Sequence, residues 1–138
     1  IPMGYTVKKV AEKTKLSPNA LRYYEKEGLL PNVGRTKGGI RLYSDEDLEW
    51  IGLICCLKNT GMSIKQIRDF VTLSLQGPET LKDRCEMLVE HKREVEEHIE
   101  EMNRYLEKVT CKISYFTQQY EDYLIQNAEE AKGGCVKE

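Results

Sequence analysis

The chain has 138 residues, of which 40% are hydrophobic and 32% charged, and its formal net charge is −2 at pH 7. A chain of this length forms one or two small domains. No apolar run in it approaches the length of a membrane-spanning helix. No secretory signal peptide is recognisable, so we expect a cytoplasmic protein. Ile1 and Pro2 precede Met3, and residues 1–3 are interpreted as a cloning remnant and the start of the protein.

The small net charge hides an uneven distribution along the chain. Residues 1–75 contain 12 Lys and Arg against 8 Asp and Glu, whereas residues 76–138 contain 9 against 15. A basic N-terminal half is typical of a protein that binds nucleic acid. Because the excess is modest, such binding would depend on well-placed contacts and on dimerisation.

Two short helices are predicted close to the N-terminus. Thr6 suits the N-cap of a first helix over residues 7–13, and Ser17 suits the N-cap of a second over 18–27. Pro18 is favourable at a first helical position, and Gly28 suits a left-handed C-terminal cap. The short connection predicts a helix-turn-helix, whose second helix enters the major groove of DNA. The candidate DNA contacts on that helix are Ser17, Asn19, Arg22, Tyr23 and Tyr24.

A short β-hairpin is predicted next. Thr36 and Ile40 flank Lys37-Gly38-Gly39, and glycines supply the positive φ of a tight turn. Alone, this pattern would also fit a solvated basic hairpin on any small domain. Directly after two helices, it predicts the wing of a winged helix-turn-helix, with cations and hydroxyls suited to phosphate oxygens. The candidate phosphate contacts are Arg35, Lys37, Arg41 and Tyr43.

Two further helices complete a predicted head domain over residues 4–76. Ser44 begins the first, followed by three acids in the first turn where the helix dipole favours them, and this helix should end near Gly61. A capping box at Ser63 and Gln66 begins the second, which runs to about Leu75.

Apolar residues then recur at alternating steps of four and three over a predicted dimerisation helix, residues 77–126, which precedes a flexible tail over 127–138. Only Lys92 breaks this seam with a strongly polar side chain, so the pattern indicates a coiled coil. The seam comprises Leu81, Cys85, Leu88, Lys92, Val95, Ile99, Met102, Leu106, Val109, Ile113, Phe116, Tyr120 and Tyr123.

Such a helix would be about 68 Å long, too long to bury its seam against so small a head. A monomeric helical hairpin would require a turn, but residues 81–126 contain no Gly or Pro. We therefore expect a homodimer, although periodicity does not decide between parallel and antiparallel helices. The expected interface residues are Leu81, Leu88, Val95, Ile99, Met102, Leu106 and Val109.

From Tyr5 to about Tyr120, this order of motifs resembles the MerR family of bacterial transcription regulators. The resemblance implies a mainly α fold, a winged helix-turn-helix head and an antiparallel coiled coil in the dimer. It also implies that the dimer binds a palindromic promoter site and, when an effector binds, distorts the DNA to realign promoter elements for RNA polymerase.

The five cysteines, at positions 55, 56, 85, 111 and 135, lack CxxC spacing and are expected to be thiols. The segment Cys56–Met62 is similar to the family branch that responds to aldehydes and thiol stress, which implies that Cys56 senses an electrophile, with Cys55 as a neighbouring alternative. The competing interpretation is that both are small buried residues. A soft metal bound by Cys111 or Cys135 with a thiol of the partner is a further alternative, although the spacing is poor and Cys85 lies on the seam. His91 and His98, seven residues apart, could bind a metal in principle but are interpreted as solvated residues on the flank of the helix.

Other function classes explain less of the sequence. No phosphate-binding loop, nucleophile elbow or clustered acid–base set is present, so we expect neither an enzyme nor a cofactor. A structural coiled-coil protein would not need the helix-turn-helix. An architectural DNA-binding protein without effector response shares the head domain and remains the alternative function.

Overall fold

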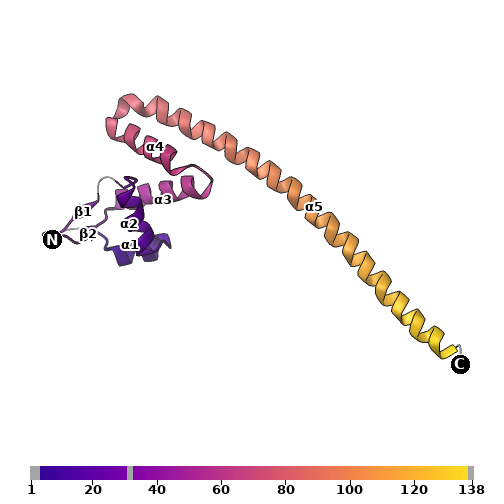
Figure 1. The fold of residues 1–138 in the computed structure, drawn as a ribbon. Coiled ribbons are helices and arrows are strands. Elements are labelled where there is room, and N and C mark those ends of the chain that lie inside the picture. The colour runs from indigo at the N-terminus through magenta and orange to yellow at the C-terminus, as the bar shows by residue number, and fades with distance from the viewer. Residues whose placement is uncertain (1–3, 31–32, 137–138) are drawn as a thin grey trace. The chain divides into compact units, whose positions relative to one another are not determined.

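The computed structural model describes residues 4–30 and 33–136, with side chains up to residue 132. The expected cloning remnant at 1–3 and the side chain of Cys135 lie outside the described residues. Figure 1 shows the order of the elements along the chain. They are α1 (Val7–Thr14), α2 (Pro18–Lys26), β1 (Gly34–Arg35), β2 (Arg41–Leu42), α3 (Asp45–Asn59), α4 (Ile64–Gln76), the 3-10 turn η1 (Pro78–Thr80) and α5 (Leu81–Val136).

The predicted helix caps are present as hydrogen bonds. Ser17 Oγ accepts the N–H of Ala20 at 3.0 Å, which satisfies one of the free donors at the start of α2. Ser44 and Ser63 each form a complete capping box, at the starts of α3 and α4. Gly28 follows α2 with φ 79°, a left-handed conformation that glycine adopts without a Cβ clash.

The wing is a two-stranded antiparallel ladder with Arg35 directly opposite Arg41. At its tip the N–H of Thr36 donates to the Ile40 carbonyl at 2.8 Å. At its base Tyr5 and Tyr43 exchange two backbone hydrogen bonds, which attach the wing to the segment before α1.

One hydrophobic core holds the head together. It contains fully buried residues from α1, α2 and α3, such as Val10, Leu21 and Ile54. Trp50 of α3 stacks on Phe70 of α4 at a ring distance of 5.9 Å, and its indole N–H donates to the Leu29 carbonyl at 2.8 Å. These contacts join α3 to α4 and to the segment that follows α2.

The beginning of α5 belongs to the same compact unit as the head, which extends to Val95. Leu88 packs against the head core, and the buried His91 ring forms a 2.7 Å hydrogen bond with Thr60 at the end of α3. The head unit is therefore longer than the predicted 4–76, because the first turns of α5 supply part of its packing.

The second unit comprises residues 96–138, which the structure describes as helix up to Val136. The helix ends later than the expected residue 126. Residues 128–132, Ala-Glu-Glu-Ala-Lys, are strong helix formers and extend α5 without a stop signal. Among the described residues, no helix combines the length and apolar character needed to cross a bilayer.

Candidate nucleic-acid interface

Asn19 and Arg22 form the exposed polar face of α2 near its N-terminus. The Arg22 guanidinium donates to the Asn19 side-chain oxygen at 2.8 Å, so the two side chains are ordered together. Both residue types can form bidentate hydrogen bonds with base edges, Arg with guanine and Asn with adenine. Ser17 lies beside them, but its hydroxyl is already used as the N-cap acceptor.

Tyr23 and Tyr24 separate, although they are adjacent in sequence. Tyr23 is 44% exposed, whereas Tyr24 is only 4% exposed and belongs to the core. The Lys58 ammonium of α3 lies over both rings, 5.5 Å and 5.0 Å from their centroids. Such cation–π contacts hold α2 against α3. Tyr24 is thus a packing residue, which corrects its prediction as a DNA contact.

Tyr43 requires the same correction. Its side chain is fully buried and its hydroxyl has no hydrogen-bond partner among the described residues. Burial, and then the nearby Glu25 carboxylate, raise the pKa of Tyr43 above its usual value, so the phenol stays protonated. Aromatic residues at a strand end look alike in sequence whether they face solvent or core, and only the tertiary packing separates them.

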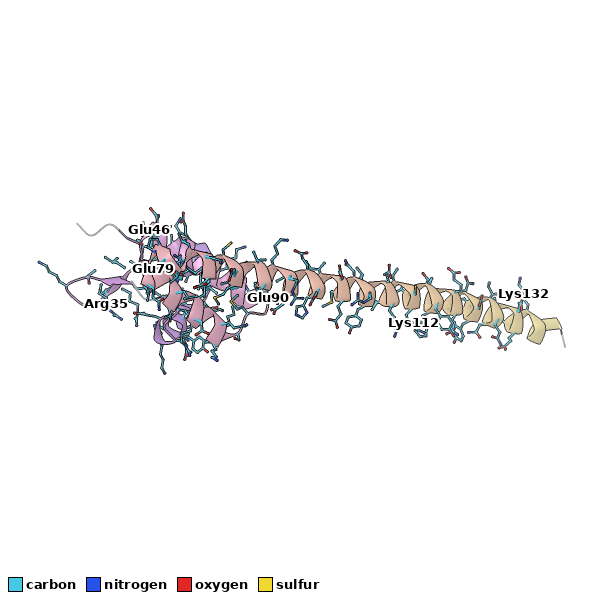
Figure 2. All side chains as sticks on the ribbon, turned by 90° about the horizontal axis from the view of Figure 1, so that it is seen from above. Arg35, Glu46, Glu79, Glu90, Lys112 and Lys132 are labelled. Atoms are coloured by element: carbon cyan, nitrogen blue, oxygen red, sulfur yellow. The ribbon has the colours of Figure 1, made fainter. Side chains whose placement is uncertain are left out.

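The wing cations also differ from one another. Lys37 at the tip is exposed, and its side chain has no hydrogen bond or ion pair with any described residue. Arg35 and Arg41 instead both bind the carboxylate of Glu25 near the end of α2. Glu25 was not predicted, although one signal exists: it is the single acid in Pro18–Lys26. Figure 2 labels Arg35 on the wing.

The two adjacent cysteines of α3 have different surroundings. Cys56 is exposed, whereas Cys55 is half-buried next to Tyr24 and Lys58. Burial raises the pKa of the Cys55 thiol, and the Tyr24 hydrogen bond and the Lys58 charge only partly oppose it. At neutral pH Cys55 is therefore mostly the less reactive thiol form.

The metal alternative gains no support from the geometry. Within the described residues, no group of three or more His, Cys, Asp or Glu side chains is placed to hold a metal ion. His91 is used in packing against Thr60, and Cys85 and Cys111 are exposed on α5.

The expected interface residues on α5 fall into two groups. Leu88 and Val95 are partly buried, and Leu88 contacts the head core of its own chain. The others are each more than half exposed and are available to a partner helix, namely Leu81, Ile99, Met102, Leu106 and Val109. This stripe and the α2–wing surface are the two candidate binding surfaces.

Comparison of the sequence with known proteins and family models points to one family. Residues 5–73 match the MerR HTH family regulatory protein model, and residues 48–109 match the model described as MerR, DNA binding. An uncharacterized HTH-type transcriptional regulator of Haemophilus influenzae is 43% identical over 114 residues, which cover 83% of this chain and 84% of that protein. The HTH-type transcriptional regulator AdhR of Bacillus subtilis is 38% identical over 87 residues, covering 63% of this chain and 62% of AdhR.

A solved crystal structure has a similar fold over most of the chain. The crystal structure of HiNmlR, a MerR family regulator lacking the sensor domain, bound to promoter DNA, is similar with a TM-score of 0.80 and 42% identity. The alignment covers 84% of this chain and 92% of that one. The similar proteins are transcriptional regulators and not enzymes.

Proposed function

The chain belongs to the MerR family of DNA-binding transcriptional regulators, and we propose that it acts in the cytoplasm as a homodimer on a palindromic promoter site. The observation that carries the DNA-binding part is the exposed, mutually ordered pair of Asn19 and Arg22 at the start of α2. The HiNmlR relative, which shares this fold, is bound to promoter DNA in its crystal structure.

Two kinds of contact divide the DNA-binding task in this proposal. Asn19, Arg22 and Tyr23 read base edges or adjacent backbone in the major groove, and Ser17 fixes the start of their helix. Lys37 and the exposed part of Arg35 contact phosphates from the wing, which sets the register of the protein on the duplex.

The homodimer is supported by the exposed stripe on α5. Ile99, Met102, Leu106 and Val109 are each at least 55% exposed in the single chain. Burying each large apolar side chain contributes roughly 1.5–3 kcal/mol before association costs. A second copy of the same stripe, running antiparallel, would cover it and would supply two head domains for two half-sites.

The proposed output is a change in DNA shape. Bound between promoter elements with an overlong spacer, the dimer would bend or untwist the duplex so that RNA polymerase engages both elements. The elastic cost of such a distortion is of order 1–6 kcal/mol for a smooth bend over a short site. Protein contacts with the DNA would have to offset this cost in the effector-activated state.

The proposed effector is an electrophile that modifies Cys56. Among the adjacent cysteines, Cys56 is the exposed one, and its carbonyl accepts the Thr60 hydroxyl at 2.6 Å. The same hydroxyl contacts His91 of α5. A modification of Cys56 would therefore occur beside the Thr60–His91 contact between the end of α3 and α5. A shift of Thr60 would then change how α3 packs against α5.

Pulse alkylation followed by mass spectrometry tests the sensor assignment. Cys56 should be modified before Cys55, because Cys56 is exposed and the raised pKa of Cys55 reduces its thiolate fraction. A small aldehyde added first should protect Cys56 from the alkylating reagent. If Cys55 reacted first, or if Cys56 were inert, the assignment of Cys56 would be wrong.

Transcription distinguishes a regulator from an architectural DNA-binding protein. The site selected by the protein from a randomised DNA library would be placed in a promoter with an overlong spacer. A regulator should change the rate of initiation when the aldehyde is added, and Cys56→Ser should remove that response while retaining DNA affinity. An initiation rate that never changes would favour the architectural function instead.

A further inference from the structure

The carboxylate of Glu25 joins the recognition helix α2 to both strands of the wing. Its Oε1 accepts a hydrogen bond from the Arg35 guanidinium at 3.1 Å, and its Oε2 accepts one from Nε of Arg41. Arg35 and Arg41 are directly opposite each other in the wing ladder. One carboxylate therefore binds both members of a cross-strand pair.

The wing has few bonds of its own, so this connection matters. Its ladder contains only two residue pairs, and an isolated two-stranded hairpin is marginally stable in water. Arg35 additionally donates to the Gly39 carbonyl at the tip, at 3.1 Å. The connection thus extends from Glu25 through Arg35 to the turn beside Lys37.

Burial makes the Glu25–Arg41 part of the connection stronger than an ordinary surface ion pair, whereas the Arg35 side chain is 45% exposed and its part is weaker. The side chains of Glu25 and Arg41 are 19% and 27% exposed, whereas exposed pairs contribute little because water and salt screen them. The unpartnered hydroxyl of Tyr43 is buried close by, where it feels the charges of Glu25 and Arg41. Charge-assisted hydrogen bonds in such partly desolvated surroundings are short and directional.

We propose that Glu25 is a positioning residue that holds the wing at a fixed distance and angle from the recognition helix. It acts through Arg35 and Arg41 and does not contact DNA. The consequence is that groove contacts from α2 and phosphate contacts from the wing engage the duplex together. This inference rests on the proposed function, because the wing has to reach phosphates for its position to matter.

The two possible roles of Glu25 predict opposite changes in DNA affinity when its charge is removed. Removing a negative charge from a DNA-binding surface should strengthen attraction to phosphates. If Glu25 positions the wing, removing its charge should weaken binding, because the freed arginines no longer hold the hairpin. The direction of the affinity change therefore separates a positioning role from a purely electrostatic one.

The test variant is Glu25→Gln, which retains the shape of the side chain but loses its charge and one acceptor oxygen. Glu27→Gln is the matched control. Glu27 also lies near the end of α2 and binds an arginine, but that residue is Arg68 of α4, at 2.7 Å, rather than a wing residue. Both variants change the net charge of the protein by the same amount.

On the duplex selected by the wild-type protein from a randomised library, Glu25→Gln should bind roughly tenfold more weakly, the size expected from losing a charged hydrogen bond. Hydroxyl-radical footprints should lose protection of the flanking backbone, whereas methylation by dimethyl sulfate should still show protection of guanine N7 in the major groove. Glu27→Gln should bind as well as the wild type or better. Unchanged or tighter binding by Glu25→Gln would overturn the proposal.

Hydrogen exchange of the DNA-free protein provides an independent readout. The amides of Thr36 and Ile40 are hydrogen-bonded within the wing, at 2.8 Å to Ile40 O and 3.2 Å to Thr36 Oγ1. Both should exchange faster in Glu25→Gln, while amides in α3 and α4 should keep their wild-type rates. Unchanged wing exchange would contradict the proposal. If the wild type selected no duplex, DNA recognition itself would fail, and the exchange rates would still decide the role of Glu25.

Discussion

The head and the distal part of α5 contain the same kinds of apolar side chain but use them differently. In the head, Leu21 and Ile54 are completely buried by residues of the same chain. On α5, Ile99 and Leu106 are 55% and 61% exposed. The head buries its large apolar side chains within one chain, whereas the stripe on α5 is exposed in the single chain, which is why we propose that a second copy covers it.

The polar side chains of the two regions also differ, in how far apart in sequence their bonded partners lie. In the head, ion pairs and side-chain hydrogen bonds join elements far apart in sequence, such as the Glu27–Arg68 pair between α2 and α4. Along the distal part of α5, side-chain hydrogen bonds such as those of Tyr105 with Glu101 and Gln118 with Asp122 connect residues one turn apart. Local bonds stabilise a helix but do not select a tertiary fold, so in the proposed dimer the partner helix supplies the long-range contacts.

The largest expected effect comes from placing charge in the stripe. The double variant Ile99→Asp, Leu106→Asp should convert the dimer to monomers, because two carboxylates per chain would have to be buried at the interface. Sedimentation equilibrium measures the mass directly, and DNA affinity should fall together with dimerisation. A dimer that persisted at micromolar concentration would refute the stripe as the interface.

Arg104→Asp is the control for that variant. It places an aspartate on the opposite side of the same helical segment and changes the charge by more than an Ile→Asp substitution does. The Arg104→Asp protein should remain a dimer, because position 104 faces away from the stripe. Dissociation of the control would indicate a general charge effect rather than a specific seam.

A smaller effect is expected from the recognition helix. Arg22→Ala should weaken specific DNA binding roughly tenfold to a hundredfold, the range for losing one good base contact. The dimer should stay intact because Arg22 lies in the head, and Lys65→Ala of α4 serves as an exposed-cation control. Equal footprints for Arg22→Ala and the wild type would remove Arg22 from the proposed interface.

The smallest effect tests the corrected role of Tyr43. Tyr43→Phe should leave DNA affinity unchanged and should raise the free energy of unfolding by up to about 1 kcal/mol, since a buried hydroxyl without a partner is costly. Urea denaturation measures the stability. Loss of DNA affinity with unchanged stability would restore the hydroxyl as a DNA contact.

Features determined by local sequence could be predicted. The caps at Ser17, Ser44 and Ser63 and the glycine after α2 are confirmed, because each depends on residues within one helical turn. The head fold and the long C-terminal helix are confirmed for the same reason: turn signals and hydrophobic periodicity determine them.

Features determined by tertiary contacts could not be predicted. The sequence does not show that Tyr24 packs against α3 while Tyr23 is exposed, or that Glu25 binds two wing arginines. The packing of the first turns of α5 onto the head was missed because their apolar residues fit the dimer seam equally well. In each case the deciding partner is distant in sequence.

The most direct test of the account is the stoichiometry of the wild-type protein on its selected duplex, measured by native mass spectrometry with a footprint of the same complex. We expect two chains per duplex and two protected half-sites related by a dyad, on one face of the DNA. One chain per duplex with a single protected half-site would contradict the account, because the exposed stripe on α5 would then have no second copy to cover it.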